Sequence, residues 1–440
     1  MARRRAALLA LALLLLAAVA AGLGRSLHRA LTPPPAPHGP PATAARVSYP
    51  YGPPLAVVEV AGEAYERGYQ QGRAVAARIR AGYGAILAHV ARGVEERLHL
   101  PGWCAGPLLD FVWWRLAPYV PEWFREEMAG LAAGAGIPYR TVCRVHAIPT
   151  LTERGCASFA ATRSAAGGPL IHLRNLDWAV ESNIQRYCQL TVVRPARGLP
   201  FVNVGWSGFL GAVSGMNAAG LSIAEITARS AADRLAGRPM VVRLREVLQE
   251  ARTLEEAVAI LTRGRRTHGF NYVVASALED AAAAVEVNAE AYARFAPGDP
   301  REAAGATGRW ARTLPGVVVR ASFCLDPRLR AAERAVGGDP ERPGLEPPRG
   351  AGYRVRYRRQ AELLAGRLGH LDVAAAEAIA RAIAPASNLQ SVVYRFPELY
   401  VANAAPLTRF DEQAKWAARA AAQPYRRFDL RAWFPETAAP

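Results

Sequence analysis

Lysine is almost absent from this sequence: Lys415 is the only one, so nearly all of the 54 basic residues are arginine. The formal net charge is +17 and the pI is near 10.3. The arginines are scattered along the chain, and the chain is rich in alanine, which indicates a bias of composition more than a phosphate-binding surface. Nucleic acid is therefore not an expected partner. Attraction to anionic lipid or to acidic substrates is the alternative interpretation of the charge.

The motifs of several common sites are also missing. The sequence contains no H-E-x-x-H and no paired C-x-x-C segment, and His146, His172 and His268 are far apart, so no metal site is expected. No G-x-G-x-x-G or Walker loop supports a nucleotide site. The segment Gly205-Trp-Ser-Gly208 approaches a serine-hydrolase elbow, but G-x-S-x-G fails because residue 209 is phenylalanine. The chemistry is expected to need neither a metal nor an organic cofactor.

The N-terminus predicts export. Three arginines precede residues 6–24, which are uncharged and mostly Ala and Leu, and Ala18-Val-Ala20 fits the small-x-small pattern before a signal-peptidase cut. A run of 19 uncharged residues also approaches the length that crosses a bilayer. Residues 1–24 are thus a signal peptide or a membrane anchor, which places the protein in the periplasm, outside the cell or on a membrane facing outward. Residues 25–54 follow as a proline-rich linker.

Cysteine is scarce, and its count is odd. An odd number in an exported protein leaves one free thiol to explain. If the others form up to two disulfides, Cys156 is the natural one to remain reactive. The alternative is that all of them are small buried hydrophobic residues. The five are Cys104, Cys143, Cys156, Cys188 and Cys324.

The folded part is predicted to be one α+β domain over residues 55–435. Apolar periodicity predicts helices at about 63–98, 108–135, 240–263 and 354–384. Residues 325–352 are predicted to form a long surface loop, and 388–396 and 398–404 a closing hairpin. Strand blocks interleaved with paired helices favour a layered α+β domain over a strictly alternating parallel sheet. Other strands are predicted at 55–60, 156–162, 169–178, 189–193, 201–206, 219–227, 271–276 and 283–287.

Cys156 carries the most specific chemical signal. It begins a predicted strand and follows Gly155, whose lack of a side chain lets the thiol approach the Gly155 carbonyl. Attack there would give a thioester, and its hydrolysis would leave a free α-amino group on Cys156. Such an amine has a pKa of about 8 and can accept the proton of its own thiol. Nucleophile and base would then share one residue, and the chain would consist of segments 55–155 and 156–435.

A hairpin brings a charged segment back to this cysteine. If the turn in Ser164-Ala-Ala-Gly-Gly168 is centred between Ala166 and Gly167, Asp177 lies across from Cys156 and Arg174 across from Phe159. A carboxylate there can orient the ammonium group, and a guanidinium can hold a thiolate or an oxyanion. A surface Arg–Asp pair at a strand end is the alternative, and it would contribute little.

These motifs resemble the cysteine N-terminal-nucleophile (Ntn) hydrolases, which include choloylglycine hydrolase, acid ceramidase and the acyl-CoA:isopenicillin N acyltransferase-like (peptidase C45) proteins. The last group is the most similar. The resemblance covers roughly residues 55–410 and comprises five motifs in the right order. They are G-x-x-Y-E-x-G-x-x-x-G at 62–72, Gly155-Cys-Ala-Ser-Phe159, Arg174-Asn-Leu-Asp-Trp178, the glycine-rich hairpin at 208–222 and the closing strands at 391–406.

The resemblance implies a four-layer αββα sandwich and a set of site residues. Cys156 carries over as the nucleophile, with Arg174 and Asp177 as its supporting pair. Thr227, which shares a strand face with Glu225, matches the family's polar group near the oxyanion, and Arg356 matches its later arginine. Glu225, Asn175 and Trp178 are predicted to bind substrate. Where many relatives have Thr-Asn-His, with the Asn assisting the oxyanion hole, this chain has Arg320-Ala-Ser322, so Ser322 or a water is expected in that role.

The predicted reaction is attack of the Cys156 thiolate on an amide carbonyl, followed by acyl transfer to water or to an amine. The substrate would be a small acyl amide. One alternative is a lipid amidase of ceramidase or bile-salt-hydrolase type. Another is a catalytically impaired, membrane-tethered binding protein of the same fold. Membrane association would occur through the N-terminal segment.

Overall fold

The computed structural model describes residues 22–36, 43–151, 155–305, 312–336 and 353–438 of the 440-residue chain. Most of the predicted signal peptide or anchor, residues 1–21, lies outside these ranges. Within them, no helix is both long and apolar enough to span a bilayer. Residues 152–154, just before the predicted cleavage bond, are also outside the described residues.

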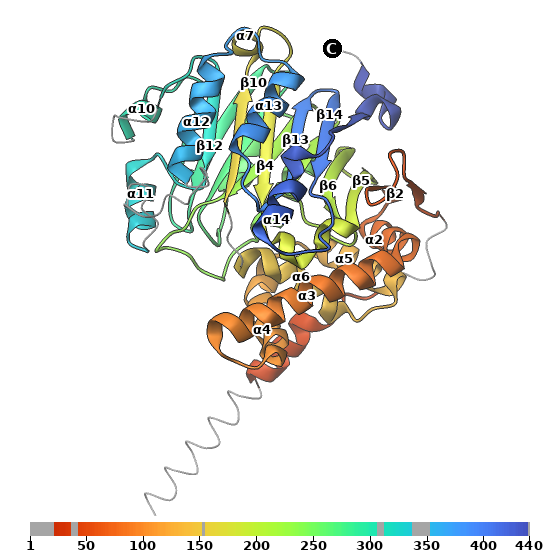
Figure 1. The fold of residues 1–440 in the computed structure, drawn as a ribbon. Coiled ribbons are helices and arrows are strands. Elements are labelled where there is room, and N and C mark those ends of the chain that lie inside the picture. Colours follow the sequence, from red (N-terminus) through yellow and green to blue (C-terminus); the bar gives the residue numbers. More distant parts are fainter. Residues whose placement is uncertain (1–21, 37–42, 152–154, 306–311, 337–352, 439–440) are drawn as a thin grey trace, which may run out of the picture.

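Two sheets form the centre of the molecule (Figure 1). In the first sheet, β2 and β5 are parallel and all other neighbouring strands are antiparallel. Its described strands, in spatial order, are β1 (Arg46–Ser48), β2 (Ala56–Gly62), β5 (Cys188–Pro195), β6 (Phe201–Trp206), β7 (Ser214–Asn217), β8 (Leu221–Thr227), β9 (Phe270–Ser276), β10 (Ala281–Val287) and β11 (Tyr292–Phe295).

The second sheet is antiparallel throughout. Its strands β3, β4 and β12 pack face to face on β8, β9 and β10 of the first sheet, and apolar side chains fill the space between the two sheets. Its described strands, in spatial order, are β12 (Val317–Ala321), β3 (Cys156–Ala161), β4 (Ile171–Asp177), β13 (Asn388–Arg395), β14 (Glu398–Asn403) and β15 (Arg426–Asp429).

Helices cover the outer face of each sheet. The helices α8 (Met240–Glu250) and α9 (Leu254–Thr262) pack on β7 to β10, and α12 (Tyr353–Ala365) and α13 (Val373–Ile383) pack on β12, β4 and β13. The layers therefore run helix, sheet, sheet, helix, and the predicted αββα sandwich is confirmed. Three shorter described helices lie elsewhere, α10 (Arg301–Gly305), α11 (Pro327–Arg334) and α14 (Glu412–Ala418), and a four-residue helix, α7 (Arg163–Ala166), joins β3 to β4.

The N-terminal helices close one end of the sandwich (Figure 1). They are α2 (Ala64–Ala74), α3 (Ala76–Leu98), α4 (Ala105–Leu116), α5 (Glu122–Ala135) and α6 (Tyr139–Leu151). The glycines of the 62–72 motif have a packing role there. A Cβ on Gly68 or Gly72 would overlap the backbone of α5, and one on Gly130 or Gly134 would overlap the backbone of α2. The spacing of these glycines thus lets two helices touch backbone to backbone.

Each long predicted helix is two helices. The break in 63–98 is at Val75, that in 108–135 lies around Pro118 and Pro121, and that in 240–263 is at Thr253, which caps α9 in a capping box with Glu256. The segment 354–384 breaks before Asp372, the N-cap of α13. The loop predicted at 325–352 is wrong in its first part, because Asp326 caps helix α11.

The linker prediction for residues 25–54 is also wrong in part. Arg46–Ser48 pair with β2 as an edge strand, and residues 22–31 are helical. All five cysteines lie in the described residues and none forms a disulfide, so the disulfide option is wrong as well. Cys143, Cys156, Cys188 and Cys324 are buried and Cys104 is partly exposed, which agrees with the alternative of small apolar side chains.

Candidate active site

An apolar pocket of about 120 Å³ opens between the N-terminal helices and the ends of the central strands. Cys156 is part of its wall, and no histidine lines it among the described residues. Most of the side chains that line it are apolar, which favours an apolar ligand. The lining side chains are Tyr83, Ile86, Val145, Ile148, Pro149, Cys156, Leu176, Asp177, Trp178, Ile184, Trp206, Ser207, Phe209, Val213, Glu225, Thr227 and Met240.

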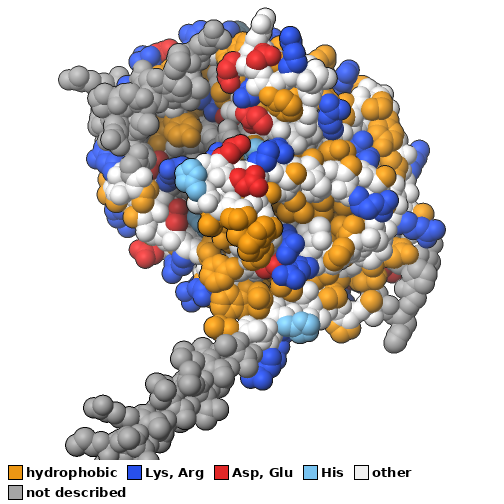
Figure 2. Space-filling model, turned by 60° about the horizontal axis from the view of Figure 1, so that its bottom comes forward, with side chains coloured by type: hydrophobic (Ala, Val, Ile, Leu, Met, Phe, Trp, Pro, Cys, Tyr) orange, Lys and Arg blue, Asp and Glu red, His pale blue; other side chains and the backbone are white. Residues whose placement is uncertain are grey.

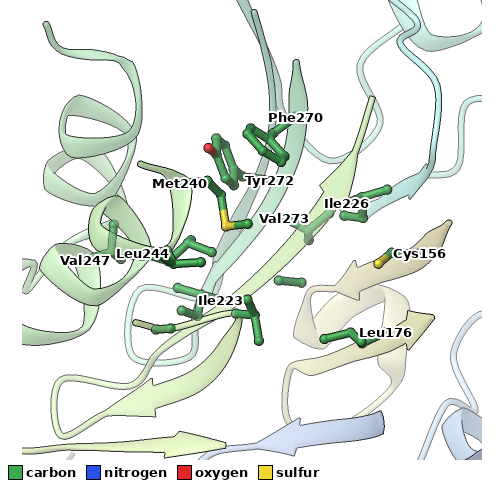
Figure 3. Packing of buried hydrophobic residues seen from close by; sticks show 14 of the residues in the cluster. Cys156, Leu176, Ile223, Ile226, Met240, Leu244, Val247, Phe270, Tyr272 and Val273 are labelled. Carbon is green, nitrogen blue, oxygen red and sulfur yellow. The ribbon is translucent and has the colours of Figure 1, made fainter. Parts of the chain in front are cut away.

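Cys156 is the first residue of β3, next to Leu176 on β4 and across from β8 (Figure 3). Its backbone N–H donates to Ser322 Oγ at 2.9 Å. A Cβ on the preceding residue, Gly155, would lie 2.5 Å from Cε1 of Tyr353 at the start of α12. The lack of a side chain at Gly155 therefore lets Tyr353 cover the bond before the cysteine.

Arg174 joins the thiol to a buried carboxylate. Its Nη1 lies 3.9 Å from Cys156 Sγ, its Nη2 donates to Glu225 Oε2 at 3.1 Å, and its Nε donates to the Val213 carbonyl at 2.8 Å. Thr227 Oγ1 donates to the other oxygen of Glu225 at 2.9 Å, as the shared strand face predicted. Burial raises the pKa of Glu225, while Arg174 and Thr227 lower it. The network fixes a guanidinium beside the sulfur.

Asp177 belongs to a second buried network. Its carboxylate pairs with Arg356 Nη1 and accepts from Asn388 Nδ2 at 3.2 Å. Burial raises the pKa of Asp177, and Arg356 acts against that rise. Arg174 and Asp177 both act on the Cys156 thiol, but they do not bind each other. Each has its own ion-pair partner: Glu225 on β8 of the first sheet for Arg174, and Arg356 on α12 of the outer helix layer for Asp177.

The predicted register of the hairpin is wrong by one residue. Cys156 pairs with Leu176, and Arg174 pairs with Ser158. The physical reason is the connection: residues 163–166 form a single helical turn that ends at Gly167 with φ of +73°, not a symmetric turn. Even so, the return strand carries Arg174 and Asp177 to the cysteine, because both residues lie near its end.

Of the predicted substrate-binding residues Trp178 and Asn175, only Trp178 lies at the pocket. Trp178 lines the pocket, with its ring 5.8 Å from that of His89. Asn175 does not: it points to the outer layer, where its Nδ2 donates to the Ala380 carbonyl at 2.9 Å and its Oδ1 accepts from Ser391 Oγ. Successive strand residues face opposite sides of a sheet, so Asn175 faces the outer helices while its neighbour Arg174 faces the first sheet.

Burial raises the pKa of the Cys156 thiol to about 12, with Glu225 and Asp177 adding to the rise and Arg174 acting against it. The thiol is therefore neutral at pH 7 in the intact chain. In the described part of the chain, no imidazole lines the pocket beside the thiol. His172 is a core residue: its Nδ1 contacts Ser222 Oγ at 2.7 Å and its Nε2 contacts Ser158 Oγ at 3.2 Å. No cluster of metal-ligating side chains occurs in the described ranges.

Ser322 contacts the backbone of Cys156, and its role at the oxyanion stays a prediction. Its hydroxyl accepts the N–H of Cys156, so it holds the nitrogen of the bond before the cysteine. Asn271 fixes this loop by donating to the carbonyls of Ala321 and Phe323 at 3.1 and 2.7 Å. Sequence reasoning missed Asn271 and Asn388, since both belong to strands whose pairing only the fold shows.

Replacing Ser322 with alanine is expected to slow turnover by up to about 100-fold, because the Cys156 nitrogen loses its acceptor and the nucleophile loses its position. The orphaned N–H should also cost about 1–3 kcal/mol of unfolding free energy. Steady-state kinetics and thermal unfolding measure the two effects. Ser322→Thr keeps the hydroxyl and should restore most of the activity. Full activity in Ser322→Ala would contradict the assignment.

Buried His172 predicts a pH-dependent stability. Burial lowers its pKa from 6.5 to about 3, so below pH 6.5 the unfolded chain binds a proton that the folded chain does not. The contribution of neutral His172 to the unfolding free energy is present above pH 6.5 and is lost as the pH falls toward 3. Relative to His172→Gln, the wild-type unfolding free energy should drop by up to about 1.4 kcal/mol per pH unit in that window. Urea unfolding of both proteins at several pH values measures this difference. Equal pH dependence of the unfolding free energy in wild type and His172→Gln would contradict the prediction.

Residues 164–303 match the family model described as acyl-coenzyme A:6-aminopenicillanic acid acyl-transferase. The matched segment contains Arg174, Asp177, Glu225 and Thr227 and begins after Cys156.

Similarity to curated proteins is partial. The proteins dcd1B and dcd1A of Dictyostelium discoideum are both 26% identical to this chain, over 252 and 246 residues, or 53% and 50% of the chain. The alignments cover 50% and 56% of those proteins, so the chain spans about half the length of the curated relatives it matches. A solved structure of a Caenorhabditis elegans N-acylethanolamine-hydrolyzing acid amidase ortholog aligns with a TM-score of 0.38 at 15% identity, covering 62% of this chain and 100% of that chain.

Proposed function

We propose that this chain, a relative of the N-terminal-nucleophile hydrolases, is an amide hydrolase or N-acyltransferase whose nucleophile is Cys156. One observation carries the proposal. The thiol opens into an apolar pocket with a guanidinium 3.9 Å from the sulfur and no imidazole in the described lining. A thiol whose pKa is about 12 needs a base, and the α-amine of Cys156 itself supplies one once the chain is cut before it.

The first proposed step is self-cleavage. Cys156 Sγ attacks the Gly155 carbonyl, the C–N bond breaks, and the nitrogen takes the thiol proton to become the α-amino group. Water then hydrolyses the resulting thioester, which frees the carboxyl group of Gly155 and restores the thiol. Tyr353, packed against Gly155, and Ser322, bound to the Cys156 nitrogen, support this step by fixing both sides of the bond.

The second proposed step is acyl transfer. The α-amine takes the thiol proton, Sγ bonds to the substrate carbonyl, and the amine of the substrate leaves with the proton that the α-ammonium returns. Water or a second amine then attacks the thioester. Arg174 is suited to stabilise the thiolate and the oxyanion, because hydrogen bonds to Glu225 and to the Val213 carbonyl hold its guanidinium in place. Asp177 is suited to stabilise the ammonium form, since it lies at the pocket wall next to the cysteine.

The lining supports an apolar acyl group, and a lipid amidase is the second candidate for that reason. Ile86, Ile148, Ile184, Trp206 and Phe209 offer contact area to an alkyl chain. Each buried methylene should add about 0.8 kcal/mol to binding, or about fourfold in kcat/KM, until the pocket is full. A series of N-acyl amides of rising chain length tests this. A flat response would remove the lipid candidate and leave the small-amide one.

An electrophilic acyl probe tests whether the site turns over. The processed protein should be labelled at Cys156 in a rapid burst, with release limited by deacylation. Mass mapping of the labelled peptide identifies the residue. An unlabelled Cys156 in correctly folded, processed protein would favour a binding protein of the same fold.

We also propose, from residues 1–24, that the protein is exported.

A further inference from the structure

Exposed apolar side chains gather at one end of the molecule, on the end of α3, the short helix η1 (Gly102–Cys104) and α4. The exposed fractions are 75% for Trp103, 54% for Leu98, 48% for Leu100 and 48% for Phe111. Single exposed apolar residues are common, but four of them on adjoining elements suit an interaction surface. These four residues are called the Trp103 patch below.

The three elements that carry the patch pack against one another. The helix η1 packs on both α3 and α4, and the Gly102 N–H donates to Glu95 Oε1 of α3 at 3.0 Å. The ring of Phe111 lies 5.6 Å from that of Trp114. Figure 2, in which this end of the molecule is turned toward the viewer, shows hydrophobic side chains gathered close to the start of the described chain.

The helical residues 22–31 pack on the same face. Trp114 Nε1 donates to Ser26 Oγ at 2.9 Å, and Trp113 Nε1 donates to the Ala30 carbonyl at 3.1 Å. Leu23 on this helix is 52% exposed. Figure 1 shows these residues beside α4 at the end of the molecule away from the sheets. The described chain thus starts, at residue 22, on the face that carries the patch.

The charge around the patch is mainly positive. Arg25, Arg29, Arg97 and Arg115 are exposed there, and Glu95 and Glu96 are the exposed acidic residues of the adjoining end of α3. The Arg115 guanidinium lies 5.6 Å from the Trp114 ring. Tryptophan and phenylalanine flanked by arginine suit the interfacial layer of a bilayer, where rings meet headgroups and guanidinium groups meet phosphates.

We infer that the Trp103 patch docks on the surface of an anionic lipid bilayer. Its position has a consequence for the pocket. The helix α3 carries both Ile86 of the pocket lining and Leu98 of the patch, twelve residues apart and hence separated by about 18 Å along the helix. A docked molecule holds its pocket near the membrane surface. The docking itself does not depend on the reaction at Cys156.

Fluorescence quenching by bromine-labelled acyl chains tests the docking. The full-length chain is mixed with vesicles of brominated phosphatidylcholine and phosphatidylserine, and the tryptophan emission is compared with that on unlabelled vesicles. Residues 1–24 contain no tryptophan, so insertion of that segment alone gives no signal. Wild type should be quenched, and Trp103→Phe should lose the larger part of that quenching. Trp433→Phe, a partly buried residue near β15, is the matched control and should behave as wild type.

Three outcomes would overturn the inference. They are equal quenching of wild type and Trp103→Phe, no quenching at all, and an unquenched Trp103 in a protein that sedimentation shows to be a dimer, which would assign the patch to a second copy. Stronger quenching on vesicles with phosphatidylserine than on phosphatidylcholine alone supports the contribution of the arginines.

Discussion

Cys156→Ala is expected to abolish turnover, with a loss of at least about 10⁴-fold in kcat, because no other cysteine of the described chain lines the pocket. The fold should survive, since a buried thiol is replaced by a smaller apolar side chain in a well-packed wall. Initial-rate assays on an acyl amide measure the effect, and thermal unfolding checks the fold.

Cys188→Ala is the matched control for this variant. Burial raises the pKa of Cys188 to about 12, as it does for Cys156, but Cys188 binds the Gln185 carbonyl and does not line the pocket. Its alanine variant should keep wild-type turnover. If both variants stay active, the nucleophile lies elsewhere. If both variants lose activity, the loss in Cys156→Ala is explained by removal of a buried side chain and not by the chemistry of its thiol.

Arg174→Leu should have the second-largest effect. Removal of the guanidinium beside the sulfur should lower kcat/KM by about 10²–10³-fold, the usual cost of losing one group that stabilises an oxyanion. It also leaves Glu225 buried without its partner, which should cost about 3–5 kcal/mol of unfolding free energy. Steady-state kinetics and urea unfolding measure the two losses on the same samples.

The double variant Arg174→Leu/Glu225→Leu separates these two effects. With both charges gone, most of the stability should return, while kcat/KM stays low. Arg245→Leu is a control for stability alone, because it breaks a buried pair with Glu127 away from the pocket lining. Recovery of activity in the double variant would show that Arg174 only neutralises Glu225.

The sequence predicted that Arg174 and Asp177 return to Cys156, but not which residues pair with them. A glycine before a cysteine at a strand start, followed by a short return strand with Arg174 and Asp177, is a local pattern, and the fold retains it with a shift of one residue. The assignment of Arg174 to Glu225 and of Asp177 to Arg356 and Asn388 depends on which elements stack, which no local pattern specifies.

The helix breaks illustrate a different limit. Thr253 with Glu256 is a readable capping box, and Asp326 and Asp372 are ordinary N-cap residues, so these helix starts could have been predicted from sequence. The backbone contact of α2 with α5 could not have been predicted in this way. The glycines of one helix permit the contact only where the glycines of the other helix face them, and that pairing is a property of the fold. Apolar periodicity predicted which segments are helical more reliably than where each helix ends.

The most direct test is intact mass and N-terminal sequencing of active, purified protein beside Cys156→Ala. If Cys156 carries both a thiol and a primary amine, the wild type must consist of two chains, one of which begins at Cys156. In the variant, which lacks the thiol, the Gly155–Cys156 bond should remain uncut. An active wild-type protein that remains a single polypeptide across Gly155–Cys156 would contradict the mechanism.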